Sequence, residues 1–274
     1  MNAENVYKKV LLVNKFEDKV IQYIKEGKIT IPVYLSKGQE VVAAILSELC
    51  SGWNIFAQHR AHDIYLCFGG DPKKLMDELM GLETGTSGGK AGSNCIHDLN
   101  INMWGHHGLI GENVPIATGF AFGSLKPTLC IFGDGAAEED YIGPSFGFAT
   151  MHKLPILYIC LDNGLSVLTP KEQRRKWRLV DIAQAYGMEM LGNHPDNNQM
   201  EDLFIDRLYE SIYNIIKFDF MPTLLNIFVC RKHWHVGTGI DNEPEWNTFE
   251  SFNKYNSIDF LKIEQEVDEL LKDI

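Results

Sequence analysis

Asp134, with a glycine on either side, is the residue of this sequence best placed to carry chemistry. The run IFGDG passes from apolar residues into Gly133, Asp134 and Gly135. Asn163 stands in the same relation to the next apolar run, ILYICL. A carboxylate and a carboxamide oxygen are hard ligands that suit Mg²⁺ and leave coordination positions for phosphate oxygens and water.

Three interpretations of Gly-Asp-Gly compete. A turn or helix cap explains the tripeptide taken alone, because Asp and Gly are favoured in both. A calcium loop fits poorly, since the alternating acidic positions of an EF-hand are missing. The third is an anchor for a cation that bridges to a diphosphate, and Asn163 favours it: glycines let the backbone approach phosphates, and a following helix offers free N–H groups.

The elements that must position these residues follow the pattern of an α/β fold. Near-continuous apolar runs alternate with helical patterns, which predicts a central, mainly parallel sheet with helices on both faces. In such sheets, ligands bind beyond the carboxyl ends of the strands, where Asp134 and Asn163 are expected. Strands are predicted at 53–57, 128–132, 156–161 and 223–230, an irregular glycine-rich loop at 81–94, and helices at 3–26, 40–50, 72–80, 112–124, 140–152, 170–187, 199–217 and 262–274.

Composition excludes several classes of function. Asp and Glu number 37 against 25 Lys and Arg, and the resulting net charge of -12 opposes contact with nucleic acid or anionic lipid. No apolar run approaches the roughly 18 residues of a membrane span. The six cysteines form no CxxC pair and are expected to be buried, reduced thiols. We therefore expect a cytoplasmic protein without a nucleic-acid or membrane partner.

The segment GDGAAEEDYIGPSFGFATMHKLPILYICLDNG, at 133–164, resembles the thiamin diphosphate signature. Within that superfamily it is most similar to the alpha subunit of the decarboxylating component of 2-oxo acid dehydrogenases, the pyruvate, branched-chain and acetoin type. Further matching motifs occur in the family's order along about residues 30–255: SKGQE at 36–40, QHRAH at 58–62, GTSGGKAGS at 85–93, WGHHGLIGENVP at 104–115 and RKHWH at 231–235.

The resemblance implies a role for each residue that matches a motif. Magnesium would be bound by Asp134, Asn163 and the backbone oxygen of Leu165. The diphosphate and the rest of the coenzyme would be bound by His59, Arg60, Gly108, Ile110, Gly135 and Ala136. His235 would reach the reactive centre of thiamin diphosphate, with His62 and His107 nearby.

The resemblance also implies an architecture and a partner. The whole chain, 1–274, would be one diphosphate-binding domain of the thiamin diphosphate-binding fold, with a helical extension over about 1–30 and a helical tail over about 245–274. A beta-type subunit would supply the pyrimidine-binding domain and an activating glutamate, in a heterotetramer of two alpha and two beta chains. The expected activity is decarboxylation of a 2-oxo acid and transfer of the resulting acyl or aldehyde unit.

Departures from the family's motifs keep two alternatives open. His59 stands in place of a tyrosine, His106 in place of a glycine, and Trp234 in place of a smaller residue. One alternative is a two-chain transketolase-like or acyloin-forming carboligase, and another is a non-catalytic assembly subunit. Three acidic residues, at 138–140, also depart from the family, and we expect them in the first turn of a helix, opposite its positive end.

Overall fold

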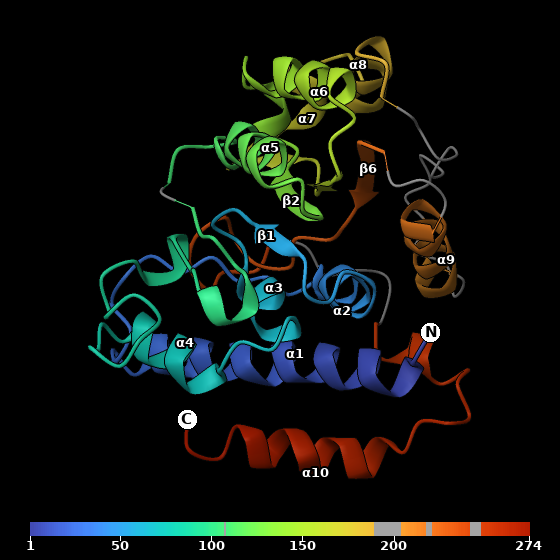
Figure 1. Cartoon of the computed structure of the whole chain (residues 1–274). Coiled ribbons are helices and arrows are strands. Elements are labelled where there is room, and N and C mark those ends of the chain that lie inside the picture. Colours follow the sequence, from blue (N-terminus) through green and yellow to red (C-terminus); the bar gives the residue numbers. More distant parts are fainter. Residues whose placement is uncertain (107, 189–203, 218–220, 242–247) are drawn as a thin grey trace.

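A parallel sheet forms the centre of the computed structural model, which describes residues 1–106, 108–188, 204–217, 221–241 and 248–274. Within these residues the sheet has four strands in the order β1-β2-β3-β6 (Figure 1). Their bounds are β1 Asn54–Phe56, β2 Thr128–Gly133, β3 Ile156–Asp162 and β6 Thr223–Phe228. A short antiparallel pair, β4 (Leu165–Ser166) and β5 (Thr169–Pro170), follows β3.

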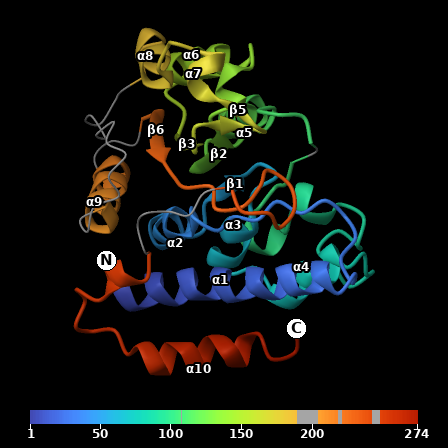
Figure 2. The same ribbon diagram turned by 180° about the vertical axis from the view of Figure 1, so that it is seen from behind.

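Side chains alternate between the two faces of this sheet, as the period of a strand requires. Ile55, Ile131 and Ile159 belong to the core on one face, and Phe132 and Tyr158 to the core on the other. Figures 1 and 2 show helices over both faces. The first face is covered by α2 (Glu40–Leu49), α3 (His62–Cys67) and α9 (Phe204–Lys217), and the second by α5 (Asn113–Ser124), α6 (Ile142–Met151) and α8 (Leu179–Ala185).

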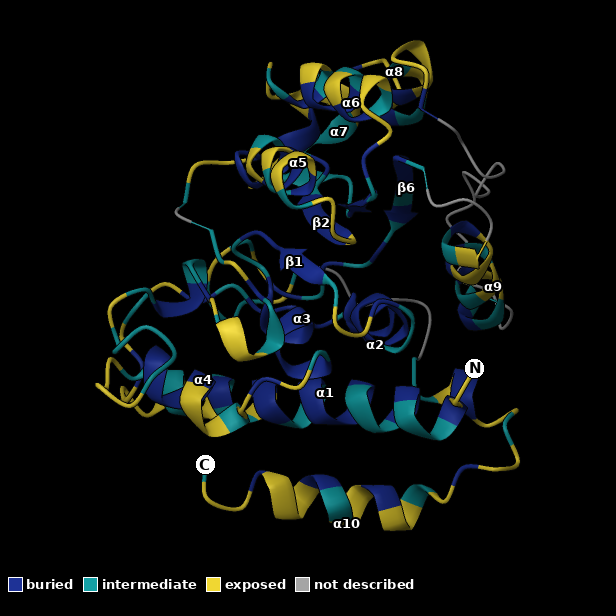
Figure 3. Ribbon diagram, in the orientation of Figure 1, coloured by how far each residue is buried: buried dark blue, intermediate teal, exposed yellow. Residues whose placement is uncertain are grey.

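Two long helices lie beyond the first face. The first, α1 (Ala3–Lys25), packs under α2 and α3, and α10 (Phe260–Leu270) packs on its outer side. Figure 3 shows that α2 is almost wholly buried and that α10 exposes its outward side. Ion pairs join α1 to α10, with Lys8 Nζ 2.6 Å from a Glu266 oxygen. Near the end of α1 lies α4 (Pro72–Leu79), which starts with an Asp71 cap and proline at the first position.

The structure confirms the predicted mainly parallel sheet with helices on both faces. One predicted element is wrong: the helix at 170–187 is two helices, α7 (Lys171–Arg174) and α8. Arg175 between them is extended, with φ -151° and ψ 154°, and its guanidinium lies 4.4 Å from the Trp177 ring. Arg174, the last residue of α7, pairs with Asp134 and Glu138, and these tertiary contacts override the helical pattern.

The remaining elements agree with the sequence pattern within a few residues at their ends. The predicted helix at 199–217 is observed from Phe204, and its first residues lie outside those described. All six cysteines are free thiols, as expected, but only four are buried: Cys95 and Cys230 are partly exposed. In the described part of the chain, no helix combines the length and the apolar character needed to cross a bilayer. The assignment of residues 1–274 to one diphosphate-binding domain stays a prediction.

Candidate active site

A cavity of ≈ 180 Å³ opens at the carboxyl ends of β2 and β3 and brings together most of the predicted site residues. From the ends of these strands and the turns after them, it is lined by Asp134, Gly135, Ala136, Asn163 and Leu165. From the opposite side, it is lined by His59, Arg60, Ile110 and His235. The position of the cavity is the one expected for a ligand site in a parallel α/β sheet.

Strand register places Asp134 beside the start of the Asn163 turn. Gly133 pairs with Leu161 in the parallel ladder, so the chain leaves both strands at the same edge. Asp134 is 1% exposed. Asn163 Oδ1 accepts a hydrogen bond from Leu165 N at 3.1 Å, which holds the carboxamide on its own turn and leaves oxygen lone pairs available. A carboxylate, an amide oxygen and a backbone carbonyl can thus converge on one cation.

Gly135 is required at its position by close packing. A Cβ atom built on this glycine would lie 2.8 Å from Ser166 Oγ, which is closer than Cβ atoms approach other atoms in proteins. The turn after β2 therefore packs directly on the turn after β3. Gly135 and Ser166 both line the cavity, so this close approach shapes part of its wall.

An acid–base cluster surrounds Asp134. Burial raises the pKa of Asp134 above its usual value, the charge of Asp162 adds to this, and the hydrogen bond from Arg174 opposes it. Arg174 contacts both Asp134 and Glu138 through its guanidinium. Asp162 is neutralised separately by Lys171, 2.7 Å away. A divalent cation on Asp134 would have to share this carboxylate with Arg174 or displace it.

This cluster corrects one expectation about the acidic run at 138–140. The helix α6 begins at Ile142 and has no acidic residue in its first turn. Glu138 instead ends a short 3-10 turn, Ala136–Glu138, and pairs with Arg174. Its role in this structure is to balance the charge of that arginine, because the chain turns once more before α6 starts.

Arg60 and His235 are connected on the opposite side of the cavity. Arg60 donates through Nη1 to Leu35 O and through Nη2 to His235 O, the latter at 3.0 Å. Burial lowers the pKa of Arg60 to about 10, so the guanidinium stays charged at neutral pH. Its two backbone partners fix the plane of the guanidinium, and a planar fork of donors suits a phosphate.

Two histidines line this side of the cavity, and the Tyr34 ring packs against both. The Tyr34 ring lies 4.7 Å from His59 and 5.5 Å from His235, and the two imidazoles are 5.3 Å apart. Burial, followed by the charge of Arg60, lowers the pKa of His59 to about 3 and that of His235 to about 4. Both imidazoles are neutral at neutral pH, so each can accept a hydrogen bond at one ring nitrogen and donate one at the other.

The segment at 231–241, which carries His235, forms contacts between its two ends. Arg231 Nε lies 2.6 Å from an oxygen of Asp241, and its Nη2 donates to Val167 O at 2.9 Å. Trp234 N donates to Gly239 O, also at 2.9 Å. The Trp234 ring fills the space beside Gly239 that a side chain there would need. These contacts hold His235 in place at the edge of the cavity.

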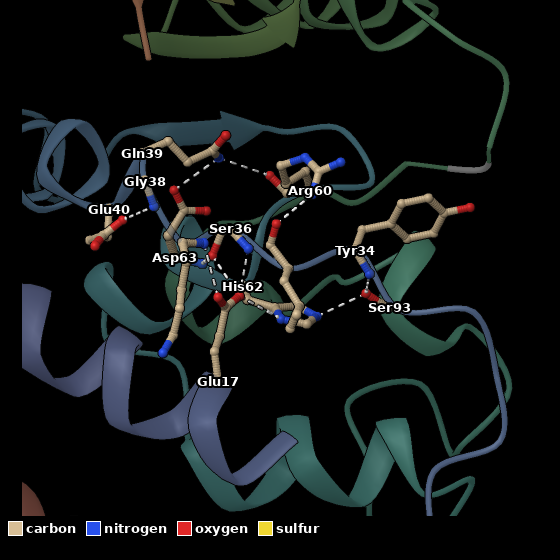
Figure 4. A network of polar contacts seen from close by, with 12 residues as sticks. Glu17, Tyr34, Ser36, Gly38, Gln39, Glu40, Arg60, His62, Asp63 and Ser93 are labelled. Atoms are coloured by element: carbon tan, nitrogen blue, oxygen red, sulfur yellow. Dashed lines mark hydrogen bonds and ion pairs between the residues drawn. The ribbon is translucent and has the colours of Figure 1, made fainter. Parts of the chain in front are cut away.

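His62 lies behind the cavity, in the buried polar network of Figure 4, and is not among the lining residues. Its Nδ1 is 3.1 Å from a carboxylate oxygen of Glu17, on α1, and its Nε2 is 2.8 Å from Ser93 Oγ. Glu17 also accepts from Ser36 N and Lys37 N, at 2.6 and 2.9 Å. The network fixes the segment at 34–39, whose Leu35 carbonyl orients Arg60.

Three further predicted residues, Gly108, Ile110 and His107, have different outcomes. Gly108 has a positive φ of 100°, and a Cβ atom on it would lie 2.9 Å from Asn94 Nδ2, but this glycine does not line the cavity itself. Ile110 does line it, and its carbonyl accepts from the Tyr141 hydroxyl. His107 lies outside the described residues.

The glycine-rich loop at 81–94 is organised by one carboxylate. Glu78, at the end of α4, accepts four backbone N–H bonds, from Ser87, Gly89, Ala91 and Gly92, at 2.7 to 2.9 Å. Burial alone would raise the pKa of Glu78, but these donors outweigh it and the net pKa is lowered. Ser93, the next residue of the loop, bonds His62, so the loop is joined to the network behind the cavity.

Metal binding at the cavity must use mixed oxygen ligands. Over the described residues, no group of three or more His, Cys, Asp or Glu side chains is arranged to hold a metal ion. A hard cation next to Asp134 would therefore complete its coordination with amide, backbone and ligand oxygens. Arg60 and the N–H groups after Asp134 suit an anionic ligand bound to that cation.

Comparison with known proteins identifies the family of the chain. The family model described as "Dehydrogenase E1 component" matches residues 7–201, well over half of the chain. The chain belongs to the dehydrogenase E1 component family. The family identification made from the motifs is thereby confirmed.

Individual relatives are moderately similar in sequence. The pyruvate dehydrogenase E1 component subunit alpha of Rickettsia prowazekii is 28% identical over 264 residues, which cover 93% of this chain and 78% of the relative. The counterpart from Porphyra purpurea is 33% identical, covering 84% and 70%. The subunit alpha of acetoin:2,6-dichlorophenolindophenol oxidoreductase from Bacillus subtilis is 33% identical over 67% of this chain and 57% of its own.

A solved structure extends the likeness to the fold. A transketolase variant from Pichia stipitis superposes with a TM-score of 0.58 at 15% identity, over 98% of this chain. This chain spans only 45% of the transketolase chain. At this identity the match shows a shared fold and nothing about the reaction.

Several cavity residues were not predicted from the sequence. Tyr34, Gln58, Arg174 and Arg231 touch the site or its predicted ligands. None was matched to a functional position of a motif, although Gln58 and Arg231 each directly follow a predicted strand, at 53–57 and 223–230. For Arg231, its place in RKHWH beside His235 was the available signal.

Proposed function

We propose that this chain is the alpha-type subunit of a two-chain thiamin diphosphate enzyme that decarboxylates a 2-oxo acid and transfers the resulting acyl or aldehyde unit. The observation that carries the proposal is the convergence of Asp134, Asn163, Arg60 and His235 on one cavity at the carboxyl edge of the sheet. Membership of the dehydrogenase E1 component family supports the same reaction class. Two of the similar relatives are named as E1 alpha subunits acting on pyruvate.

The residues present fit magnesium and a diphosphate. Asp134, the Asn163 carboxamide and the Leu165 carbonyl would hold the cation, and their donor atoms are all oxygens, as Mg²⁺ requires. Arg60 and the backbone after Gly135 would hold the diphosphate, because Arg60, Gly135 and Ala136 line the same cavity. Ile110 and the neighbouring Gly108 would contact the aminopyrimidine end.

Thiamin diphosphate supplies a stabilised carbanion that adds to a carbonyl carbon, which is the chemistry that amino-acid side chains lack. The chain's own residues would bind and orient the coenzyme and form hydrogen bonds with the substrate. Arg60 would hold the anionic end with the N–H groups that Leu35 O and His235 O leave unused. Arg231 with Asp241 holds the segment that carries His235. The neutral His235 imidazole would donate a hydrogen bond to, or accept one from, an oxygen of the bound substrate.

A partner chain is part of the proposal. Helices α5 and α6 expose large apolar side chains, among them Phe122, Phe148 and Met151, the last 79% exposed. The Phe122 and Phe148 rings are 5.2 Å apart, so these residues form one patch. A contiguous exposed apolar patch is typical of a protein–protein interface. We propose a beta-type subunit as the partner, in a heterotetramer of two alpha and two beta chains.

The alternatives have less support. A transketolase-like or acyloin-forming carboligase would rest on the fold match, which carries no information on the reaction at 15% identity. A non-catalytic assembly subunit would have no need for a buried Asp134 beside Asn163 and Arg60 in one cavity. A screen of 2-oxo acids for carbon dioxide release, with and without an aldehyde acceptor, separates these activities.

Calorimetric titration tests the coenzyme assignment. The chain, purified with the partner that it is co-expressed with, should bind thiamin diphosphate only in the presence of Mg²⁺. Asp134→Ala should weaken binding by at least about 100-fold, since it removes the charged ligand of the bridging cation. Asp140→Ala, an exposed acid nearby, is the matched control and should bind as the wild type does. Unchanged affinity in Asp134→Ala would contradict the proposal.

A further inference from the structure

Gln58 reaches the candidate active site from the segment after β1, although no motif assigned it a role. It lines the cavity together with Gly133, Asp134 and Arg60, and only 8% of the residue is exposed. A glutamine this deeply buried is expected to use both ends of its carboxamide in hydrogen bonds.

One hydrogen bond fixes the orientation of the Gln58 carboxamide. Gly133 N donates to Gln58 Oε1 at 2.8 Å. A backbone N–H can only donate, so the atom that it meets must be the amide oxygen, and the NH₂ end must point the other way. Among the described residues, Nε2 is buried and meets no acceptor. The side chain thus has a fixed, unused donor.

A second glutamine of the same cavity provides a contrast. Gln39 Nε2 donates to Asp63 Oδ2 at 3.0 Å, so the protein itself satisfies this donor. Leaving a buried amide donor unpaired destabilises a protein, whereas pairing it with an anionic oxygen gives a short, strong hydrogen bond. For Gln58, the acceptor must therefore come from a molecule in the cavity.

We propose that Gln58 is a coenzyme-binding residue whose Nε2 donates to an oxygen of the diphosphate while its Oε1 remains on Gly133 N–H. The inference rests on the proposed function, because it takes the cavity to hold thiamin diphosphate. Gly133 immediately precedes Asp134, where the cation would bind, and Arg60 lies two residues after Gln58. The diphosphate is thus the part of the coenzyme nearest to the donor, and it is rich in acceptors.

Two substitutions separate the donor from the rest of the side chain. Gln58→Glu keeps the size and the acceptor for Gly133 N–H, but removes the donor and adds a negative charge. Gln58→Met keeps the size and removes both hydrogen bonds. Gln184→Glu, on the exposed surface of α8, is the matched control for the change in net charge. Thermal melts establish that each variant is folded.

Calorimetry with two probes measures the effect on the full chain, purified with the partner that it is co-expressed with. The probes are inorganic pyrophosphate and thiamin diphosphate, each with MgCl₂. Gln58→Met should bind both about 10-fold more weakly than wild type, and Gln58→Glu more than about 100-fold more weakly. The control should bind both as the wild type does. Equal losses for the two probes would support a contact with the diphosphate.

The outcomes distinguish this inference from the proposed function. Wild-type protein that binds neither probe would overturn the proposed function itself. Wild-type binding with unchanged affinity in Gln58→Glu would overturn the role of Gln58 alone. If both variants fail to fold, a crystal structure of the wild type with thiamin diphosphate and Mg²⁺ decides: Nε2 within hydrogen-bond distance of a phosphate oxygen supports the contact, and Nε2 on a water molecule only refutes it.

Discussion

Asp63 is a completely buried acid in the network that orients Arg60. Gln39 Nε2 donates to its Oδ2, and its own backbone N–H donates to Ser36 Oγ at 3.2 Å. Burial raises the pKa of Asp63 to about 8, against the opposing hydrogen bond from Gln39. The carboxyl is therefore largely protonated at neutral pH. A neutral group next to Glu17 and Glu40 avoids a third buried charge in this part of the protein.

Asp63→Asn should change how stability depends on pH. The pKa of the Asp63 carboxyl is higher in the folded protein than in the unfolded chain. Its contribution to the free energy of unfolding is therefore fully present below about pH 4, and it is lost as the pH rises towards 8. The neutral asparagine keeps the acceptor for Gln39 and removes this loss. We expect a gain in unfolding free energy of at least about 1 kcal/mol at pH 8, since one such group contributes up to about 1.4 kcal/mol per pH unit.

Urea denaturation at several pH values between about 5 and 8 measures this effect. The exposed Asp140→Asn provides the control and should follow the wild-type curve. If Asp63→Asn also follows the wild-type curve, the Asp63 carboxyl is ionised in the folded protein and the assignment is wrong.

At the residue scale, the sequence was sufficient to predict site residues whose place depends on their position at the end of a strand. Asp134 and Asn163 each follow an apolar run, and adjacent parallel strands end at the same edge of a sheet. The contact between Arg174 and Asp134 had no such signal, because it joins residues 40 apart through a turn of irregular structure. The buried partner of His62, Glu17, is likewise 45 residues away on α1.

At the scale of elements, the segment at 33–37 connects the buried network with the segment that carries His235. Glu17 and Ser93 hold it from one side, through Ser36 N, Lys37 N and Tyr34 N. On its other side, Val33 O accepts from Gly237 N at 2.9 Å, and Lys37 O accepts from Lys232 N at 3.2 Å. Hydrogen bonds through this one short segment therefore connect helix α1 with the segment that carries His235.

Glu17→Gln should loosen both sides of that segment. The new NH₂ group would face N–H and O–H donors, and the buried pair with His62 would be broken, which typically costs about 3–5 kcal/mol. Hydrogen exchange should then accelerate at the amides of Lys232 and Gly237, because the carbonyls that accept from them are no longer held. Exchange measured by NMR or mass spectrometry on the ligand-free chain reports this directly.

Glu48→Gln is the matched control for this experiment. Glu48 also bonds α1, through Asn5 at 2.5 Å and Lys9 at 2.7 Å, but it does not contact the segment at 33–37. The control should leave the amides of Lys232 and Gly237 protected. Equal protection of these amides in the two variants would mean that Glu17 stabilises α1 without positioning the active-site segment.

Sequence periodicity predicted elements best where one face of each is buried against the sheet. The strands and the helices α2, α5 and α6 fall at the expected places because their apolar residues pack against a core. The helix predicted at 170–187 is interrupted, because Arg174 pairs with Asp134 and Glu138, far from it in the sequence. Charge contacts with distant residues leave no period in a sequence.

On the scale of the whole molecule, the helices on the two sides of the sheet expose surfaces of different polarity. On one side, α10 covers α1 and exposes a largely polar surface. On the other, α5 and α6 expose Phe122, Phe148 and Met151 with no element of the described chain over them. Glycines of α5 at 119 and 123 also have open space around them, which permits close approach of another backbone.

A charge placed in that apolar patch should prevent assembly with the proposed beta-type partner. Phe122 is 48% exposed, so Phe122→Glu can fold without burying the carboxylate, but an interface over the patch would have to desolvate it. We expect the affinity for the partner to fall by at least about 30-fold, equivalent to about 2 kcal/mol. Leu261→Glu, on the exposed side of α10, is the control and should assemble normally. Size-exclusion chromatography with light scattering of the co-expressed pair measures the outcome: a wild-type heterotetramer that persists in Phe122→Glu would place the interface elsewhere.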